Sequence, residues 1–129
     1  MRNISFMLTT RQVLAEQKTV TRRLGWLHVK TGDLLQGVEK CQGLGKGGTM
    51  KRLKVIRVVS VRRERLGMLE DDIRYGRAEI DREGFRDDPR FLCPAKWVQW
   101  FCNSHKGCTP ETEVTRIEFE YVAAKEATQ

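Results

Sequence analysis

The sequence predicts an α+β fold in which a mixed sheet or small β-barrel is flanked by helices. Strand-like segments occur near the start, in the middle and near the end of the chain, without regular alternation of strand and helix. No repeat of about 20–50 residues is present. This order favours a mixed sheet or barrel over a doubly wound fold. One domain is expected over residues 1–129, with a frayed tail at 123–129.

The N-terminal segments predict a strand, a short helix and a loop. Residues 2–8 partly alternate between polar and apolar side chains, as a strand does. Thr9 and Thr10 can cap a helix over residues 11–17. Residues 18–23 predict a loop, since each charge buried in a core would need a partner.

The central segments predict two strands joined by a glycine-rich connection. Residues 34–41 follow a turn signal at residues 30–33 and predict a strand. Residues 42–50 contain four glycines but lack the spacing of a phosphate-binding P-loop, and they predict a loop between strands. Residues 53–61 form the most convincing strand, because they are nearly continuous in β-branched side chains.

The C-terminal half predicts helices followed by a last strand. Residues 66–72 predict a helical turn, and residues 73–83 a polar helix that ends at Gly84. Another helix can start at Pro94. Its apolar stripe consists of Trp97, Val98, Trp100 and Phe101. We interpret these aromatic side chains as core rather than as a stacking platform. Residues 114–121 alternate cleanly and predict the final strand.

The net charge of +7 is concentrated in one half of the chain. Residues 1–65 hold 15 Lys and Arg against 4 Asp and Glu, giving +11, whereas residues 66–129 hold 9 against 13, giving −4. This asymmetry indicates a polar partner such as RNA or a nucleotide; a solvated basic surface without a partner is the alternative. No apolar run approaches the roughly 18 residues of a membrane span, and no signal peptide is evident, so we expect a cytoplasmic protein without a membrane partner.

The cysteines are expected to be reduced thiols. They are Cys41, Cys93, Cys102 and Cys108. Cys102 and Cys108 bracket His105, and thiolate and imidazole are ligands that zinc prefers. The paired C-x2-C spacing of common zinc sites is absent, however. We therefore interpret these residues as structural and expect neither a metal nor another cofactor.

The segment Lys-Thr-Val-Thr-Arg-Arg at residues 18–23 places an amine, two hydroxyls and two guanidiniums within six positions. Such a concentration of donors suits an anionic or carbonyl-bearing ligand. The spacing Lys-x-x-Thr is not specific by itself, because it occurs three times. The pairs are Lys18 and Thr21, Lys46 and Thr49, and Lys106 and Thr109.

Four segments together resemble the ASCH domain family. They are the strand Ile4-Ser5-Phe6, the segment Lys18-Thr19-Val20-Thr21-x-Arg23, the turn Lys30-x-Gly32-Asp33 and the later Glu83-Gly84-Phe85. The resemblance runs from about residue 3 to residue 122 and implies a PUA-like fold, a small mixed β-barrel with flanking helices. Members of the PUA-like group bind RNA or modified bases. One bacterial branch of ASCH proteins hydrolyses N4-acetylcytidine to cytidine and acetate.

The resemblance to that amidohydrolase branch implies three catalytic residues: Lys18, Thr21 and Glu83, with Glu79 as a rival for the carboxylate. Thr21 would supply the nucleophilic hydroxyl, Lys18 in its neutral form the base, and Glu83 the proton for the leaving nitrogen. The predicted ligand is a nucleoside or RNA. The predicted substrate-binding residues are Thr19, Arg22, Arg23 and Trp26.

Two alternatives remain open at this point. The first is a non-catalytic RNA-binding module that contacts phosphates through basic side chains. These nucleic-acid-binding candidates, besides Arg22 and Arg23, are Lys46, Lys51, Arg52 and Arg57. The second is a ribonuclease of the ASCH type, in which His28 or His105 would assist Lys18 in proton transfer.

Overall fold

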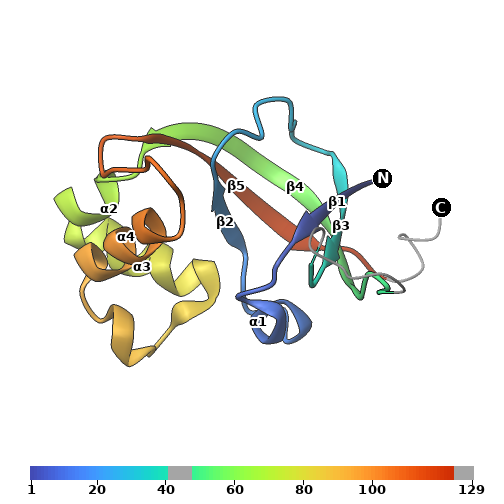
Figure 1. Cartoon of the computed structure of the whole chain (residues 1–129). Coiled ribbons are helices and arrows are strands. Elements are labelled where there is room, and N and C mark those ends of the chain that lie inside the picture. Colours follow the sequence, from blue (N-terminus) through green and yellow to red (C-terminus); the bar gives the residue numbers. More distant parts are fainter. Residues whose placement is uncertain (41–47, 124–129) are drawn as a thin grey trace.

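Five strands form a single sheet that curls into half a barrel (Figure 1). The computed structural model describes residues 1–40 and 48–123. The strands are β1 (Arg2–Ser5), β2 (Val20–Arg23), β3 (Leu34–Val38), β4 (Arg52–Arg65) and β5 (Glu113–Tyr121). Their order across the sheet is β1-β3-β4-β5-β2. Strand β1 pairs with β3 in parallel, and every other pair is antiparallel. The expected α+β class, with a mixed sheet and helices beside it, is confirmed, and in place of the expected small barrel the sheet forms half a barrel.

Four of the five strands lie where the sequence predicts them, and the exception is β2. Residues 20–23 were expected in a loop, and that prediction was wrong: Val20–Arg23 pairs with β5 in the register Val20 to Glu118 through Arg23 to Thr115. The argument that a buried charge needs a partner still holds. The partners come from glutamates more than 40 positions away in the chain, which no local pattern reveals.

The helices gather mainly at one end of β4 and β5, on the left of Figure 1. They are α1 (Thr10–Leu14), α2 (Met68–Asp71), α3 (Ile73–Ile80), the π-helical turn η1 (Asp81–Phe85), the 3-10 turn η2 (Pro89–Phe91) and α4 (Pro94–Asn103). Asp72 caps α3 by accepting a hydrogen bond from the Tyr75 backbone N–H at 3.1 Å. Pro94 begins α4, where its missing N–H costs no helical hydrogen bond. The predicted helical segments after residue 66 are thereby confirmed.

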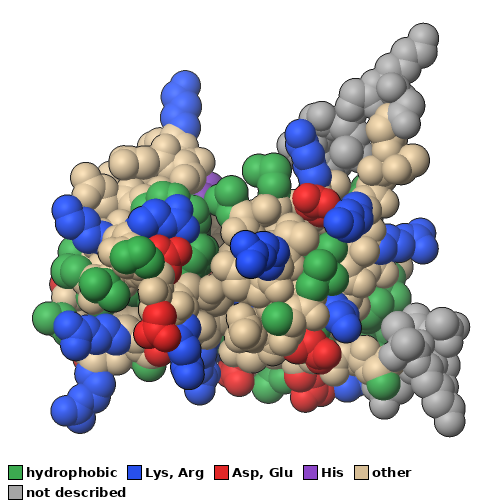
Figure 2. Space-filling view, turned by 90° about the horizontal axis from the view of Figure 1, so that it is seen from below, with side chains coloured by type: hydrophobic (Ala, Val, Ile, Leu, Met, Phe, Trp, Pro, Cys, Tyr) green, Lys and Arg blue, Asp and Glu red, His purple; other side chains and the backbone are tan. Residues whose placement is uncertain are grey.

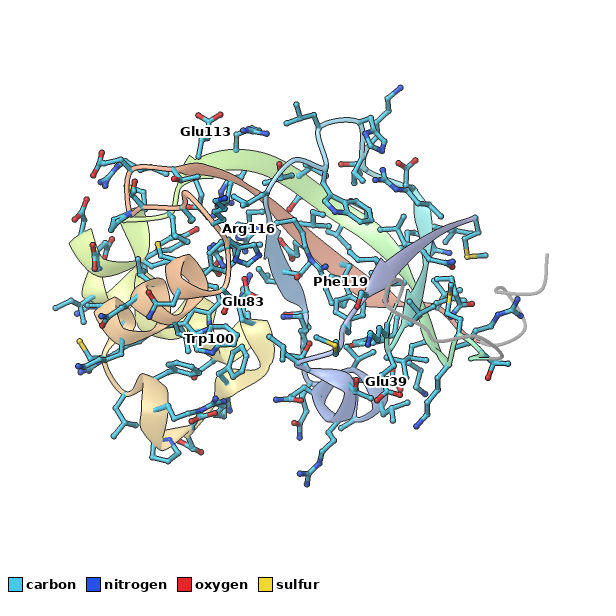
Figure 3. All side chains as sticks on the ribbon, in the orientation of Figure 1. Glu39, Glu83, Trp100, Glu113, Arg116 and Phe119 are labelled. Atoms are coloured by element: carbon cyan, nitrogen blue, oxygen red, sulfur yellow. The ribbon has the colours of Figure 1, made fainter. Side chains whose placement is uncertain are left out.

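Two apolar clusters fill the molecule. The first packs the inner face of the sheet and includes Ile4, Phe6 and Ile56. The second lies among the helices and includes Leu69, Ile80 and Trp97. Together with Trp97, both Val98 and Phe101 are buried, which confirms the core interpretation for those three residues. Several buried charged side chains occupy the junction between the clusters, and they position the site described below (Figure 3).

Two predictions fall outside the described residues. Most of the glycine-rich connection at residues 42–50 belongs to the gap at residues 41–47, as do Cys41 and Lys46. The tail predicted at residues 123–129 lies outside the described part from residue 124 onward. Across the residues that are described, no helix combines the length and the apolar character needed to span a bilayer.

Candidate functional site

A cavity of about 210 Å³ opens between the sheet and the helices. Its walls come from the connection between β1 and α1, from β2, from η1 and from α4. The polar lining includes the three residues implied as catalytic. The lining residues are Ser5, Phe6, Met7, Leu8, Thr9, Lys18, Thr21, Arg22, Arg23, Glu83, Phe85, Trp97, Trp100, Phe101, Ser104 and His105. The structure therefore brings Lys18, Thr21 and Glu83 to one cavity.

Lys18 is buried and is held by one residue of η1. Its Nζ donates hydrogen bonds to Glu83 Oε1 at 2.9 Å and to the Glu83 backbone oxygen at 2.6 Å. Gly84, which follows Glu83, has a left-handed φ of 104° that would strain any residue with a Cβ. The Lys18 carbonyl in turn accepts a hydrogen bond from the Tyr121 hydroxyl at 2.5 Å. The side chain of Lys18 is thus held by η1, and its backbone is held by β5.

The surroundings of Lys18 favour its neutral form more than water does. Burial lowers its pKa below the ordinary 10.5, and this effect outweighs the opposing attraction of Glu83. The charges of Arg23 and Arg22 lower the Lys18 pKa further. A lysine with a lowered pKa is better suited to proton transfer than an ordinary one, because its neutral amine, which can accept a proton, is more easily formed.

Thr21 and Arg23 face the cavity from β2 as a linked pair. The buried Thr21 Oγ1 accepts a hydrogen bond from Arg23 Nε at 3.1 Å. Among the described residues, no acceptor contacts the Thr21 hydroxyl hydrogen. Arg23 NH2 also donates to the backbone oxygen of Ser5 at 2.6 Å. Because Ser5 ends β1, Arg23 joins the two outer strands of the sheet and places its guanidinium at the cavity rim.

Arg22 connects the cavity to a buried ionic network. Its NH1 donates to Glu83 Oε2 at 3.0 Å, and its NH2 donates to Glu79 Oε1 at 2.5 Å and to Glu64 Oε1 at 2.8 Å. The Tyr75 hydroxyl lies 3.2 Å from the same NH2. Arg22 is only 3% exposed, so these carboxylates occupy the guanidinium that was expected to bind substrate. Through its NH1 group, Arg22 holds the carboxylate of Glu83 in place.

The structure separates the roles of Glu79 and Glu83. Glu83 lines the cavity, whereas Glu79 does not line it and accepts hydrogen bonds from Arg116 at 2.5 and 3.1 Å. Burial tends to raise the pKa of Glu79, but the Arg116 hydrogen bonds and the charge of Arg22 overcome it and lower the pKa to about 2. Figure 3 shows Glu83 between Arg116 and Trp100, at the junction of sheet and helices. Of the two rivals, Glu83 is the one at the cavity.

Aromatic rings form the helical wall of the cavity. Phe85 meets Trp100 edge-on at a centroid distance of 5.4 Å, and Trp97 stacks on Phe101 at 5.5 Å. Trp100 is half-buried, unlike its fully buried neighbours in α4. The sequence interpretation assigned the rings of α4 to the core and did not predict that they also line a cavity. The spacing of Trp97, Trp100 and Phe101 along one helical face was the available signal.

Other predicted site residues lie away from this cavity. The Thr19 backbone N–H donates to the Arg82 carbonyl at 2.8 Å, on the far side of η1. Trp26 lies beneath the guanidinium of Arg2, 3.9 Å from its ring centroid, and beside the ring of His28. Neither Thr19 nor Trp26 lines the cavity.

The basic candidates are spread along and before β4. Lys51 and Arg52 are exposed, and Lys51 lies 3.8 Å from Glu39. Arg57 NH1 donates to Glu120 at 3.0 Å. Lys46 falls outside the described residues.

Three of the four cysteines lie within the described residues. Cys93 is exposed, and Cys102 and Cys108 are half-buried free thiols. Burial, helped by the neighbouring Cys108, raises the pKa of Cys102 to about 11, which disfavours its thiolate. Within residues 1–40 and 48–123, no three His, Cys, Asp or Glu side chains are placed to hold a metal ion.

Two solved structures resemble this arrangement of elements. Protein EF3133 from Enterococcus faecalis V583, of family DUF984, gives a TM-score of 0.66 at 13% identity, over 100% of this chain and 82% of that one. An ASCH domain from Lactobacillus crispatus JV V101 gives a TM-score of 0.54 at 14% identity, over 93% of this chain and 78% of that one. The chain shares the fold of that ASCH domain. Comparisons with family models and with curated proteins gave no match.

Proposed function

We propose that this chain is an ASCH-domain amidohydrolase of the cytoplasm that cleaves the amide of an N-acylated nucleoside, with N4-acetylcytidine as substrate. The observation that carries the proposal is the meeting of Lys18, Thr21 and Glu83 in one cavity, although Glu83 lies 65 positions from Lys18 in the chain. The fold shared with an ASCH domain agrees with the ASCH-domain part of this proposal. A hydroxyl, an amine and a carboxylate are the groups that amide hydrolysis needs.

The first half of the reaction forms an acyl-enzyme. The Thr21 oxygen attacks the acetyl carbon, and the hydroxyl proton passes to the neutral amine of Lys18. Arg23, already hydrogen-bonded to Thr21, faces the negative charge that develops on the acetyl oxygen. The proton moves from Lys18 across the 2.9 Å contact to Glu83 and on to the leaving nitrogen, as the carbon–nitrogen bond breaks and cytidine departs.

The second half restores the enzyme. Water attacks the acetyl group on Thr21 and gives one proton to Lys18, which passes it to the Thr21 oxygen as the bond between that oxygen and the acetyl carbon breaks. The acetic acid released gives its other proton to solvent and leaves as acetate, so Lys18 is neutral again and the Thr21 hydroxyl is reformed. No group other than water is consumed. Arg22 takes no proton; it holds Glu83 Oε2 at 3.0 Å and fixes the direction of the carboxylate.

The size and lining of the cavity fit one small planar ligand. Its volume of about 210 Å³ is below the roughly 300–1,000 Å³ of sites for drug-sized molecules. Half-buried Trp100 offers a ring on which a base can stack. A single acylated base is therefore a better match than a folded oligonucleotide.

The direct test is hydrolysis of N4-acetylcytidine by purified protein, followed by release of cytidine. The wild type should turn over, Thr21→Ala and Lys18→Met should lose at least about 100-fold, and Thr21→Ser should retain part of the activity. Lys51→Met is the matched control, because Lys51 is exposed and lies outside the cavity. Absence of turnover by the wild type, or full activity of Lys18→Met, would refute the proposal.

A non-catalytic RNA-binding module is the second candidate. It is favoured by the exposed cations Lys51 and Arg52 in the basic half of the chain. Figure 2 shows Lys and Arg side chains distributed over one face, with Asp and Glu among them. Such a module would bind single-stranded RNA with an affinity that falls steeply with salt, and Lys51→Glu with Arg52→Glu would weaken it. An affinity that stays constant between 50 and 200 mM salt rejects this candidate.

A further inference from the structure

His105 lines the same cavity but takes no part in the reaction derived above. It follows the C-terminal end of α4, where its ring stacks on Phe101 with centroids 4.2 Å apart and an angle of 21°. Its Nδ1 lies 2.8 Å from the Phe101 backbone oxygen. The ring is thus fixed by one stacking contact and one hydrogen bond, both to the same residue.

The contact with Phe101 determines which nitrogen carries the hydrogen. A carbonyl oxygen only accepts hydrogen bonds, so Nδ1 must donate. In the neutral imidazole the other nitrogen, Nε2, is then an acceptor with a free lone pair. Among the described residues, no donor contacts Nε2.

The other ionisable side chains of the cavity do not offer a vacant acceptor. Arg22 and Arg23 are donors, and the lone pair of the neutral Lys18 amine receives the Thr21 proton in the proposed reaction. The two carboxylate oxygens of Glu83 already accept from Lys18 and Arg22. Of the ionisable groups lining the cavity within the described residues, His105 alone has an acceptor atom that carries no donor and has no part in the proposed reaction.

The two walls of the cavity therefore differ in polarity. Lys18, just before β2, and Arg23, in β2, line the cavity as donors, and His105, just after α4, lines it with a ring whose Nε2 is an unpaired acceptor. A secondary amide is almost always trans, so its N–H points away from its carbonyl oxygen. An acylamino group that turns its carbonyl toward β2 directs its N–H toward α4.

We infer that His105 Nε2 accepts a hydrogen bond from the amide N–H of the ligand and thereby selects secondary amides on a planar base. This inference rests on the proposed function, whose substrate it narrows to bases with a singly acylated exocyclic amine. A ligand whose amide nitrogen carries an alkyl group in place of hydrogen leaves Nε2 without a donor and gains nothing from His105.

The test compares two ligands in a background that cannot cleave them. Thr21→Ala and Thr21→Ala/His105→Phe are titrated with N4-acetylcytidine and with N4-acetyl-N4-methylcytidine, and circular dichroism checks that each variant is folded. Phenylalanine keeps a ring against Phe101 and removes the acceptor. We expect about tenfold weaker binding of N4-acetylcytidine and no change for the methylated ligand. His105→Gln, which restores an acceptor, should recover most of the loss. Asn103→Ala, at an exposed position of α4 outside the cavity lining, should change neither Kd.

Equal weakening of both ligands would show that His105 only packs the wall, and unchanged Kd values for both would show that it does not contact them; either result overturns the inference. Hydrolysis by the wild type is measured separately. Selective binding through His105 without any turnover by the wild type would refute the proposed reaction while leaving the His105 contact intact. Failure of the folded Thr21→Ala protein to bind either ligand overturns both.

Discussion

Replacing Glu79 by glutamine tests whether the buried ionic network holds the helices on the sheet. Glu79 comes from α3, and its two cationic partners, Arg22 and Arg116, come from β2 and β5. All three side chains are buried. Glutamine keeps the size of the side chain and removes its charge, so two guanidiniums lose their shared counter-charge.

The size of the effect follows from the pKa of Glu79. A fall from the ordinary 4.5 to about 2 corresponds, at about 1.4 kcal/mol for each pH unit, to about 3 kcal/mol of folding stability. Because the folded-state pKa is depressed, this contribution is complete above pH 4.5 and is lost as the pH falls toward 2. Removal of one partner from a buried ion pair costs about 3–5 kcal/mol in other proteins, which agrees.

Urea denaturation at pH 7, 4 and 2.5 measures the effect. Glu79→Gln should lower the free energy of unfolding by about 3 kcal/mol at pH 7, and the gap to the wild type should shrink at pH 4 and be mostly closed at pH 2.5. Glu120→Gln is the matched control, because its partner Arg57 is exposed and such pairs contribute less than about 1 kcal/mol. A Glu79→Gln gap that equals the control, or that is the same at all three pH values, contradicts the argument.

Three further predictions concern the packing of the core and one buried hydroxyl. Gly76→Ala should destabilise the fold by more than about 2 kcal/mol in thermal melts, because a Cβ there would lie 1.9 Å from the Leu69 carbonyl oxygen; a melting temperature equal to the wild type contradicts this. Ile56→Ala should cost about 2–5 kcal/mol by urea denaturation and Val59→Ala less than about 1, since Ile56 is fully buried and Val59 is 40% exposed; equal losses would be inconsistent with that contrast. Tyr75→Phe should lower the free energy of unfolding by about 1 kcal/mol in the same assay, because the Tyr75 hydroxyl lies 3.0 Å from Glu64 and 3.2 Å from Arg22. A variant more stable than the wild type would contradict this.

Strands with an apolar pattern could be read from the sequence. Residues 53–61 and 114–121 lie within β4 and β5, because β-branched runs and clean alternation are decided by neighbours in the chain. The strand β2 could not be read in this way. Arg22 sits in a strand only because Glu64, Glu79 and Glu83 reach it from three other elements, and that compensation exists in the tertiary structure alone.

The site was predictable in part for the same reason. Lys18 and Thr21 belong to one short motif, and the resemblance to ASCH domains added Glu83. The local sequence gave no basis for choosing between Glu79 and Glu83. The choice is visible only in the tertiary structure, where Lys18 contacts Glu83, and Arg22 and Arg116 contact Glu79. The departure of Trp26 from the site has a local cause. Its backbone turns away directly after β2 ends, with a φ of 54°.

The two contacts between Lys18 and residue 83 differ in what mutation can remove. One acceptor is the carboxylate and the other is a peptide oxygen, which survives every substitution. A Glu83→Ala or Glu83→Gln protein therefore keeps the hydrogen bond from Lys18 Nζ to the backbone oxygen of residue 83. A change in its activity then reports the loss of the negative charge and not a displacement of the Lys18 amine. Substitutions at residue 83 can for this reason separate the effect of its charge from the effect of the position of Lys18.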